Sequence, residues 1–353
     1  MANLIDNDAY ELTPDRAGYS GYPNIVRDSN GRIYVAHVNI SGYLEIHYSD
    51  NEGRNWTLDT TFTDDTDIRC PCLCIDSNDN LYISFTYVVT YWTSFTAKVK
   101  KRTYATGSWS EIRSKTGQPS LDFFMKSFIA INRCSTYPDR LHFFWVYSSG
   151  ASDSIIANEY SDNGGSSWSA TNTKLVNNCR IIGFALDTLA VNGFILFYTA
   201  SNVTPGGDTY YPRTYSYTHA GAYWDVREIA TDMEGLCGIL DEDDYDWLIF
   251  ITTTDVYVYK STLPGQAYAQ SLNFSEVIKP GSVCISTDES KNIYIFYTKN
   301  TDSNLYMRKY SNSESSWKSE VALSSVSDGL NPSCEKRVLP GSEIVSHVYY
   351  NAP

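Results

Sequence analysis

Hydrophobic and polar positions along this chain follow the pattern of short β-strands joined by tight turns. Apolar-rich runs of five or six residues each follow a cluster of Ser, Asn, Asp or Gly, and they include Ile33–Val38, Leu81–Phe85, Trp247–Ile251 and Ile293–Tyr297. Short runs rich in β-branched and aromatic residues, bounded by turn formers, are typical of strands. No long segment has the 3.6-residue periodicity of an amphipathic helix. The pattern therefore predicts an all-β fold.

One sequence unit recurs along the chain. The segment Ser49–Trp56 returns as Ser161–Trp168, and a tyrosine precedes each copy. Weaker copies end at Trp109, Trp224, Tyr268 and Trp317, and the leading tyrosines recur about every 52 residues. A second marker is an aspartate followed six residues later by an aromatic residue, in the pairs Asp28 and Tyr34, Asp76 and Tyr82, Asp241 and Trp247, and Asp288 and Tyr294. A period of this length is typical of propeller blades.

Each unit reads as four strands, which in the first unit are Pro23–Arg27, Ile33–Val38, Tyr43–Tyr48 and Asn55–Thr61. First strands begin near residues 23, 71, 126, 180, 236, 282 and 332. We therefore expect a single domain over residues 1–353, a seven-bladed β-propeller with six blades as the alternative. The strand-like stretch Ala9–Thr13 is expected to complete the last blade and close the ring, which removes exposed sheet edges.

The repeated turn, Ser-x-Asp/Asn-x-Gly-x-x-Trp, resembles the Asp box, or BNR repeat, of sialidase-type β-propellers, with Asn51 and Asn163 where the family usually has aspartate. The resemblance implies a structural turn on the face opposite the usual ligand site, with Trp56 and Trp168 packed between sheets. Sialidases also carry an Arg-Ile/Leu-Pro motif before the first box. The matching place here is Gly21-Tyr22-Pro23-Asn24, so no catalytic residue is carried over and sialidase activity is not expected.

Composition and charge exclude several partners. The chain has 353 residues and a net charge of −14, which argues against nucleic acid as a general partner. No apolar run reaches the ~18 residues that a membrane helix needs, so no membrane insertion is expected. The first residues show neither a basic start nor an apolar stretch, so no secretory signal is visible. The sequence does not determine the location of the protein, and it favours a virion or the cytoplasm.

Cysteines are abundant, at eight, but the repeat argues against disulfides. Cys72, Cys237, Cys284 and Cys334 occupy the same position in different units, each ten residues before an equivalent strand residue. Equivalent side chains in diverging blades are expected to lie beyond the ~7 Å Cα separation that a disulfide allows. A metal site on the alternating residues Cys70, Cys72 and Cys74 lacks a histidine partner. We expect free thiols, no metal and no cofactor.

Two further polar groups leave alternatives open. His37 and His347 occupy equivalent positions in the first and last units, so they either fill the core or form a polar pair near the axis. The acidic segment Asp241–Asp246 lacks the spacing of an EF-hand calcium loop. It is expected to be a solvated turn, with a calcium site as the alternative.

Two connections between second and third strands are longer and less repetitive than the others, Tyr87–Trp92 and Ala200–Arg213. Binding residues are often grafted on such loops of a rigid scaffold. Aromatic rings beside polar groups suit stacking on sugars or a protein interface, although they also serve to cover the base of their own loop. The expected ligand-binding residues are Tyr87, Tyr91, Trp92, Asp208, Tyr210, Tyr211 and Arg213.

These observations favour a non-catalytic binding or structural propeller that recognises a glycan or a protein through this loop face. By analogy of fold, such a protein suits a virion or a phage tail. The alternative is a glycoside hydrolase or polysaccharide lyase whose active site differs from that of the sialidases, and a third candidate is an intracellular scaffold. The sequence leaves the oligomeric state open.

Overall fold

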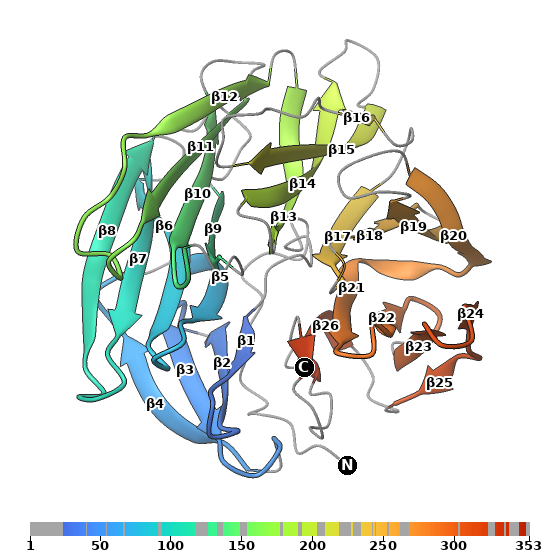
Figure 1. Cartoon of the computed structure of the whole chain (residues 1–353), viewed down its shortest axis with the longest axis horizontal. Coiled ribbons are helices and arrows are strands. Elements are labelled where there is room, and N and C mark those ends of the chain that lie inside the picture. Colours follow the sequence, from blue (N-terminus) through green and yellow to red (C-terminus); the bar gives the residue numbers. More distant parts are fainter. Residues whose placement is uncertain are drawn as a thin grey trace.

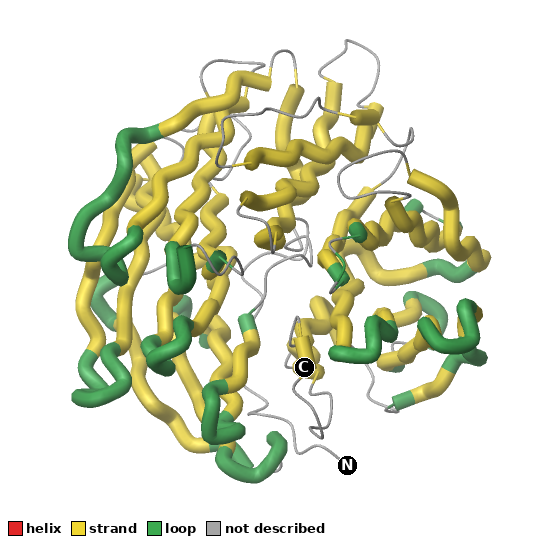
Figure 2. Tube along the Cα trace, viewed as in Figure 1, coloured by secondary structure: helices red, strands yellow, loops and turns green. Residues whose placement is uncertain are grey.

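The computed structural model describes residues 24–39, 41–53, 55–65, 68–90, 94–117, 126–132, 137–148, 154–176, 179–189, 193–202, 209–218, 227–228, 234–241, 243, 245–252, 254–261, 268–302, 304–323, 329–334, 337–338 and 346–350. Within these residues the regular structure is β-strand throughout, and no helix is drawn in Figure 2. The described part accordingly contains no helix that could cross a membrane. The all-β prediction is confirmed.

Five sheets are four-stranded antiparallel meanders in chain order, which we call blades 1 to 5. Blade 1 contains β1 (Ile25–Arg27), β2 (Ile33–Val38), β3 (Leu44–Ser49) and β4 (Thr57–Phe62). Blade 2 contains β5 (Ile68–Ile75), β6 (Leu81–Thr90), β7 (Ser94–Arg102) and β8 (Trp109–Gly117). Blade 3 contains β9 (Lys126–Ile131), β10 (Leu141–Ser148), β11 (Ser154–Ser161) and β12 (Asn172–Val176).

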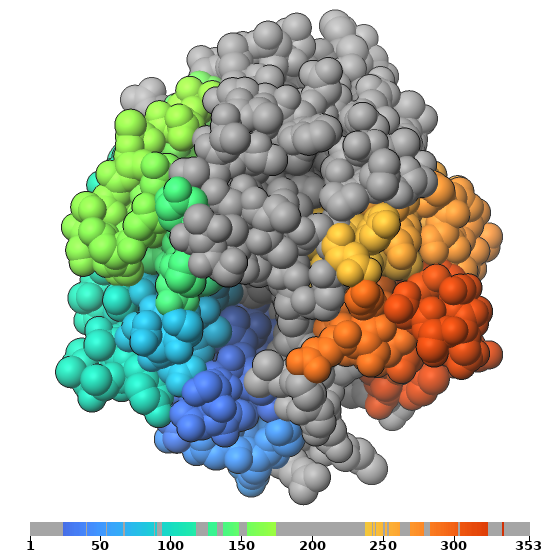
Figure 3. Space-filling model, viewed as in Figure 1, coloured from blue at the N-terminus to red at the C-terminus, as the bar shows by residue number. Residues whose placement is uncertain are grey.

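The fourth and fifth blades follow the same plan. Blade 4 contains β13 (Cys179–Leu189), β14 (Gly193–Asn202), β15 (Thr209–Thr218) and β16 (Arg227–Glu228). Blade 5 contains β17 (Glu234–Leu240), β18 (Asp246–Ile251), β19 (Asp255–Ser261) and β20 (Tyr268–Ser275). Figure 1 shows the chain passing around the molecule from one sheet to the next in sequence order, and the coloured parts of Figure 3 follow the same order.

The last two sequence units do not form four-stranded blades. A six-stranded sheet, here sheet 6, contains β21 (Ile278–Asp288), β22 (Ile293–Lys299), β23 (Leu305–Ser311), β24 (Ser316–Trp317), β25 (Val321–Ala322) and β27 (Arg337–Val338). Strands β26 (Gly329–Cys334) and β28 (Ser346–Tyr350) form a separate two-stranded ladder. The expectation of seven blades, with six as the alternative, is therefore wrong, because the propeller has five four-stranded blades.

The physical reason is that the final unit divides its strands between two sheets. Strand β27 pairs in parallel with β21 of the preceding sheet, at Thr287 with Arg337 and Asp288 with Val338. Only β26 and β28 then pair with each other. The expected closing strand Ala9–Thr13 lies outside the described residues.

The aspartate marker of the repeat caps the turn between the first two strands. In blade 2, Asp76 Oδ1 accepts hydrogen bonds from the backbone N–H groups of Asn78 (3.0 Å) and Asn80 (2.9 Å). Its Oδ2 accepts from the hydroxyl of Tyr82, six residues on, at 2.8 Å. The same cap recurs where Trp247 Nε1 donates to Asp241 and the Tyr294 hydroxyl donates to Asp288. One carboxylate thus fixes the turn and orients a buried ring.

These turns also bind successive blades to each other. Ser29 of blade 1 donates from its backbone N–H to Asp79 Oδ1 of blade 2 at 2.9 Å. Ser77 of blade 2 makes the same contact with Asp139 of blade 3 at 2.8 Å. Asp79 and Asp139 both have positive φ angles, 59° and 61°, a conformation that Asp tolerates better than most residues. The interface of blades 1 and 2 therefore shares this geometry with the interface of blades 2 and 3.

The two strong copies of the repeated turn have matching hydrogen bonds. In blade 1, the backbone N–H of Gly53 donates to Ser49 Oγ at 2.9 Å, and the N–H of Asn55 donates to Asn51 Oδ1 at 2.8 Å. In blade 3, the backbone N–H of Gly165 donates to Ser161 Oγ at 2.9 Å, and the N–H of Ser167 donates to Asn163 Oδ1 at 2.8 Å. The two bonds of this turn match the two bonds of the turn in blade 1. Asparagine therefore supplies the turn acceptor in both copies.

Tryptophans in or just before the outer strands join neighbouring sheets. The Trp168 indole N–H of blade 3 donates to the backbone carbonyl of Ile112 in blade 2 at 3.2 Å. Gly165 approaches the same residue so closely that a Cβ there would lie 2.3 Å from Ile112 Cδ1. Trp109 donates to Asp59 of blade 1 at 3.0 Å, and Trp317 of sheet 6 donates to Ser271 of blade 5 at 3.2 Å. The predicted packing of Trp168 between sheets is confirmed.

A buried carboxylate adds an ionic contact between blades 2 and 3. Glu159 of β11 is 1% exposed and binds Arg113 and Lys115 of β8, with 2.7 Å between Arg113 Nε and Glu159 Oε2. Burial opposes ionisation of Glu159. The hydrogen bonds from Lys115, Thr171 and Arg113 outweigh it, and they hold the pKa of Glu159 below its ordinary value. The charged form of Glu159 therefore stabilises the blade interface.

The six cysteines whose side chains are described form no disulfide, in agreement with the prediction for them. One pair of equivalent cysteines nevertheless lies close together. Cys284 of β21 and Cys334 of β26 share a buried cluster, and a hydrogen bond joins their thiols. Burial, reinforced by this contact, raises the pKa of the Cys284 thiol. Innermost strands of neighbouring sheets contact each other near the axis, which is where these equivalent side chains meet.

Replacing Trp168 with alanine should destabilise the protein by about 2–4 kcal/mol, because a large half-buried ring and an inter-blade hydrogen bond are both lost. Trp168→Phe keeps most of the ring and should cost about 1 kcal/mol, the usual value of one hydrogen bond. Denaturant unfolding followed by fluorescence measures both. Equal stability of the wild type and the alanine variant would contradict a bridging role.

Replacing Glu159 with glutamine should lower the free energy of unfolding by about 2–3 kcal/mol at neutral pH. This loss is smaller than the ~3–5 kcal/mol for breaking a fully buried ion pair, because Arg113 and Lys115 are themselves partly exposed. A carboxyl whose folded pKa is depressed stabilises the protein above its unfolded pKa of about 4.3, and that contribution is lost as pH falls. The stability gap between wild type and variant should therefore shrink below about pH 4.5.

The matched control is Asp50→Asn, since Asp50 is largely exposed and pairs with Arg32 at the surface. Urea unfolding across a pH series compares the three proteins. The buried ionic contact would be excluded if the stability difference between wild type and Glu159→Gln stayed constant down to pH 3. It would also be excluded if that difference matched the one between wild type and Asp50→Asn.

Candidate functional site

Topology sorts the connections of the propeller onto two faces. In each four-stranded meander, the turns between first and second strands lie at the same end as those between third and fourth strands, and the connections between second and third strands lie at the other end. The capped aspartate turns and the box-like turns therefore share one face. The opposite face, here the variable face, carries the β2–β3, β6–β7 and β14–β15 connections.

Several residues predicted to lie in variable loops belong to strands. Strand β6 continues to Thr90, and Tyr87 pairs with Thr96 of β7, so the hairpin of blade 2 extends four residues beyond the end of β2 in blade 1. In blade 4, Tyr210, Tyr211 and Arg213 lie in β15 opposite residues of β14. The loops themselves are shorter than predicted. Tyr91, Trp92 and Asp208 lie outside the described residues.

Tyr87 is held in place by the blade beneath it. Its ring packs against the core cluster shared by blades 1 and 2, and Lys98 Nζ lies 4.7 Å from the ring centroid. Lys98 in turn binds Asp65 at 2.9 Å and Glu111 at 3.2 Å. Burial alone would lower the pKa of Lys98, but these two carboxylates raise it. Two residues further along, Val89 is 53% exposed at the end of the hairpin.

Strands β2 and β3 bring together three polar side chains that the sequence did not single out as a group. His37 and Glu45 are direct cross-strand partners, and His47 follows Glu45 by two residues on the same face. The alternating residues of these strands, such as Ala36 and Ile46, pack toward blade 2. The three polar side chains therefore lie on the other face of blade 1, close to the β2–β3 turn.

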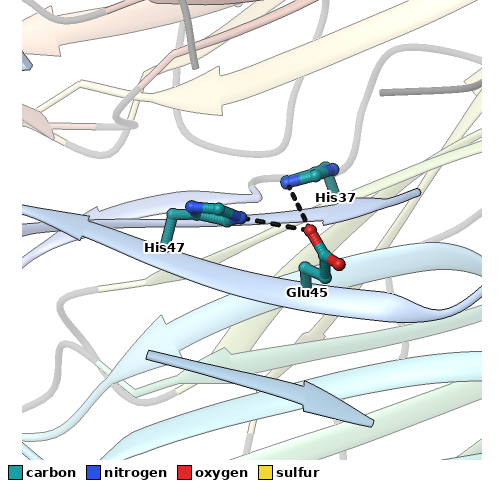
Figure 4. A group of neighbouring side chains, drawn as sticks. All are labelled: His37, Glu45 and His47. Carbon is teal, nitrogen blue, oxygen red and sulfur yellow. Dashed lines mark hydrogen bonds and ion pairs between the residues drawn. The ribbon is translucent and has the colours of Figure 1, made fainter. Parts of the chain in front are cut away.

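Figure 4 shows the Glu45 carboxylate between the two imidazole rings. Glu45 Oε2 lies 3.2 Å from His47 Nε2 and 3.6 Å from His37 Nε2. The ring centroids of the two histidines are 4.9 Å apart. The His37 side chain is 2% exposed, and those of His47 and Glu45 are 12% and 18% exposed. The group is thus pre-formed and largely shielded from water.

Asn39 completes this group from the turn. Its Nδ2 donates to Glu45 Oε1 at 2.6 Å, and its Oδ1 accepts from the backbone N–H groups of Ser41 and Tyr43. Burial opposes ionisation of Glu45. The hydrogen bonds from Asn39 and His47, with the positive field of the histidines, outweigh it and hold the pKa of Glu45 below its ordinary value. The group therefore contains a carboxylate anion.

A signal for this site was present in the sequence. Glu45-Ile46-His47 alternates along one strand, which puts Glu45 and His47 on one face, and the short turn fixes His37 opposite Glu45. His37 contacts Glu45 and His47, and its pairing with His347 stays a prediction. The side chain of His347 lies outside the described part.

The other candidate metal positions have different roles in the structure. Asp241 accepts hydrogen bonds from Asp243 and Tyr245 backbone N–H groups and from the Trp247 indole, which supports the turn interpretation over a calcium site. Cys72 Sγ donates to the carbonyl of Ile129 in blade 3 at 3.3 Å. Among the described residues, His37, Glu45 and His47 form the one group of such side chains whose donor atoms converge within 4.8 Å.

No protein-family profile matches the sequence, and no curated protein matches it. Solved structures do resemble it in fold. The GH93 α-L-arabinofuranosidase of Fusarium graminearum, in complex with arabinobiose, is 12% identical with a TM-score of 0.55, and the match covers 84% of this chain and 92% of that one.

Two further similar structures also involve glycans. A PL25-family ulvan lyase bound to GlcA(1-4)Rha3S has a TM-score of 0.60 at 10% identity, with 95% of this chain and 89% of that chain covered. A variant of the Aleuria aurantia lectin AAL, in complex with Fucα1-6GlcNAc, has a TM-score of 0.52 at 10% identity, with 88% and 97% covered. At these identities the likeness shows that the fold is shared.

Proposed function

We propose that this protein is a carbohydrate-binding β-propeller that recognises its glycan on the variable face. The single observation that carries the proposal is the fold. A hydrolase, a lyase and a lectin that differ in chemistry share this propeller architecture, and each of their structures holds a saccharide. What these relatives have in common is sugar recognition on a rigid scaffold.

The shape of the variable face agrees with this proposal. The β6–β7 hairpin stands four residues above its neighbour in blade 1, with Tyr87 braced by Lys98 at its base. A height difference between adjacent blades supplies a wall for a ligand. Aromatic rings held by a rigid frame bind sugars at low ordering cost. The predicted ligand-binding residues Tyr91 and Trp92 follow directly in the connection of this hairpin.

A catalytic function is the second candidate, and one observation favours it. His37, Glu45 and His47 bring two imidazoles and an ionised carboxylate together near the same face. Imidazole is the commonest general acid or base of enzymes. The reaction would be glycoside hydrolysis or polysaccharide lysis by a site unlike that of the sialidases.

Two finer assignments remain proposals. The matched hydrogen bonds of the turns at Ser49–Gly53 and Ser161–Gly165 support an Asp-box kinship, with asparagine in place of aspartate. The virion or phage-tail assignment and the protein-partner alternative stay predictions.

A glycan array that includes arabinan, uronic acid-containing and fucosylated oligosaccharides tests the proposal. We expect saturable binding, and Trp92→Ala should weaken it by about 5- to 100-fold, the usual effect of an aromatic anchor. The thermal midpoint should change little if Trp92 lies in a loop outside the core, as the sequence predicts. The matched control is Tyr104→Ala, an exposed tyrosine on the opposite face, which should bind like the wild type.

The same oligosaccharides, incubated with the protein and separated by chromatography, distinguish binding from catalysis. Intact saccharides support the binding module. Cleavage with a new reducing end, or with an unsaturated uronic acid, supports the hydrolase or lyase. Absence of binding to every glycan class would contradict both candidate functions. An equal loss of glycan affinity in Trp92→Ala and in the Tyr104→Ala control would place the binding site elsewhere.

A further inference from the structure

The group formed by His37, Glu45 and His47 has the geometry of a metal site. Zinc–nitrogen bonds of about 2.0–2.1 Å place adjacent ligand atoms of a tetrahedral site about 3.3 Å apart. The carboxylate oxygen lies 3.2 Å from one Nε2 and 3.6 Å from the other, so both distances are already close to a tetrahedral edge. All three donor atoms lie within 4.8 Å of one another, so small side-chain rotations would complete the site.

Asn39 gives the carboxylate the orientation that a metal ligand needs. It donates to Glu45 Oε1 at 2.6 Å, which occupies that oxygen and leaves Oε2 directed between the two imidazoles. Ligands of bound metals are typically oriented by such outer hydrogen bonds. Asn39 is itself fixed by the turn that joins β2 to β3, through its bonds to the Ser41 and Tyr43 backbone.

The donor set selects the class of metal. Calcium and magnesium take oxygen ligands, whereas two imidazoles with one carboxylate suit zinc and related transition metals. Three protein ligands leave one coordination position for water or for an incoming group. Because the three side chains come from neighbouring positions of one hairpin, the ladder itself holds them in register, so little ordering is required on binding.

We propose that His37 Nε2, Glu45 Oε2 and His47 Nε2 bind a single Zn²⁺ ion, with the fourth position open. The site lies on the face of blade 1 that turns away from blade 2, at the end near the β2–β3 turn. This site is independent of the proposed glycan recognition, since it follows from the ligand atoms alone. The proposal departs from the expectation from sequence that the chain binds no metal.

Titration of the metal-stripped, untagged and fully reduced protein with Co²⁺ tests the proposal, because Co²⁺ reports its ligands through visible absorption. We expect one equivalent to bind, with the absorption of a four- or five-coordinate nitrogen and oxygen site, and we expect Zn²⁺ to displace it. Zn²⁺ in large excess over its Kd should also raise the thermal midpoint by about 4 °C, since a ligand of the folded state stabilises that state.

Two variants and one control assign the site. Glu45→Gln, which is nearly isosteric, and His47→Ala should each weaken Zn²⁺ binding by about 100-fold or more, since even outer-shell partners change affinity by about 10- to 100-fold. Asp50→Asn removes an exposed carboxylate of the same blade and should leave the affinity unchanged. If His47→Ala fails to fold, the Zn²⁺ affinity of Glu45→Gln decides whether the site is assigned correctly.

Three outcomes would overturn the proposal. One is absence of stoichiometric Co²⁺ or Zn²⁺ binding by the wild type. Another is an intense near-ultraviolet thiolate-to-cobalt band, which would assign the metal to the cysteines. The third is unchanged affinity in Glu45→Gln. Because the readout is metal binding, these outcomes are distinguishable from a failure to bind glycans.

Discussion

The indole hydrogen bond between neighbouring outer strands is the contact on which the arrangement of the sheets depends. Trp109 and Trp317 lie in outer strands, Trp168 precedes one, and each donates to the preceding sheet. Their acceptors, Asp59, Ile112 and Ser271, each lie three residues beyond the aromatic residue at the same place in that preceding sheet. At these three interfaces one position of the repeat therefore receives the tryptophan of the next unit, which fixes the two sheets relative to each other although the acceptor group varies.

This constraint separates the two faces of the propeller by role. The indole contacts, the aspartate caps and the serine–aspartate links occupy strand starts and turns that repeat from blade to blade. Their residues are committed to turn and inter-blade hydrogen bonds, so they have little freedom to change. In the described part the β2–β3 and β6–β7 connections carry no indole contact and no serine–aspartate link, although Asn39 caps the β2–β3 turn, and their hairpins differ in length. Variation in the ligand-facing parts is therefore compatible with a constant frame.

Local features of the fold were predictable from the sequence, and long-range ones were not. The Asp76–Tyr82 spacing and the Trp168 turn encode hydrogen bonds that form within one unit or with the next, so the repeat revealed them. The number of four-stranded blades depends on where the last strands pair, and β27 pairs with β21 instead of completing its own sheet. Tyr87 was assigned to a loop because the repeat placed the end of the second strand at Phe85, although Tyr, Val and Thr favour strands. Glu45 and His47 were missed because the repeat directed attention to the equivalent residue His347 rather than to the cross-strand neighbour of His37.

The central claim is that a glycan binds the variable face, and hydrogen–deuterium exchange with and without the best oligosaccharide of the array tests it most directly. The account predicts slower exchange in the β2–β3 hairpin around residues 37–47 and in the upper part of the β6–β7 hairpin, residues 84–99. Exchange in the aspartate-capped turns at residues 28–32, 76–80 and 288–292 should stay unchanged. Protection confined to those turns, at a saccharide concentration that saturates the protein, would contradict the account.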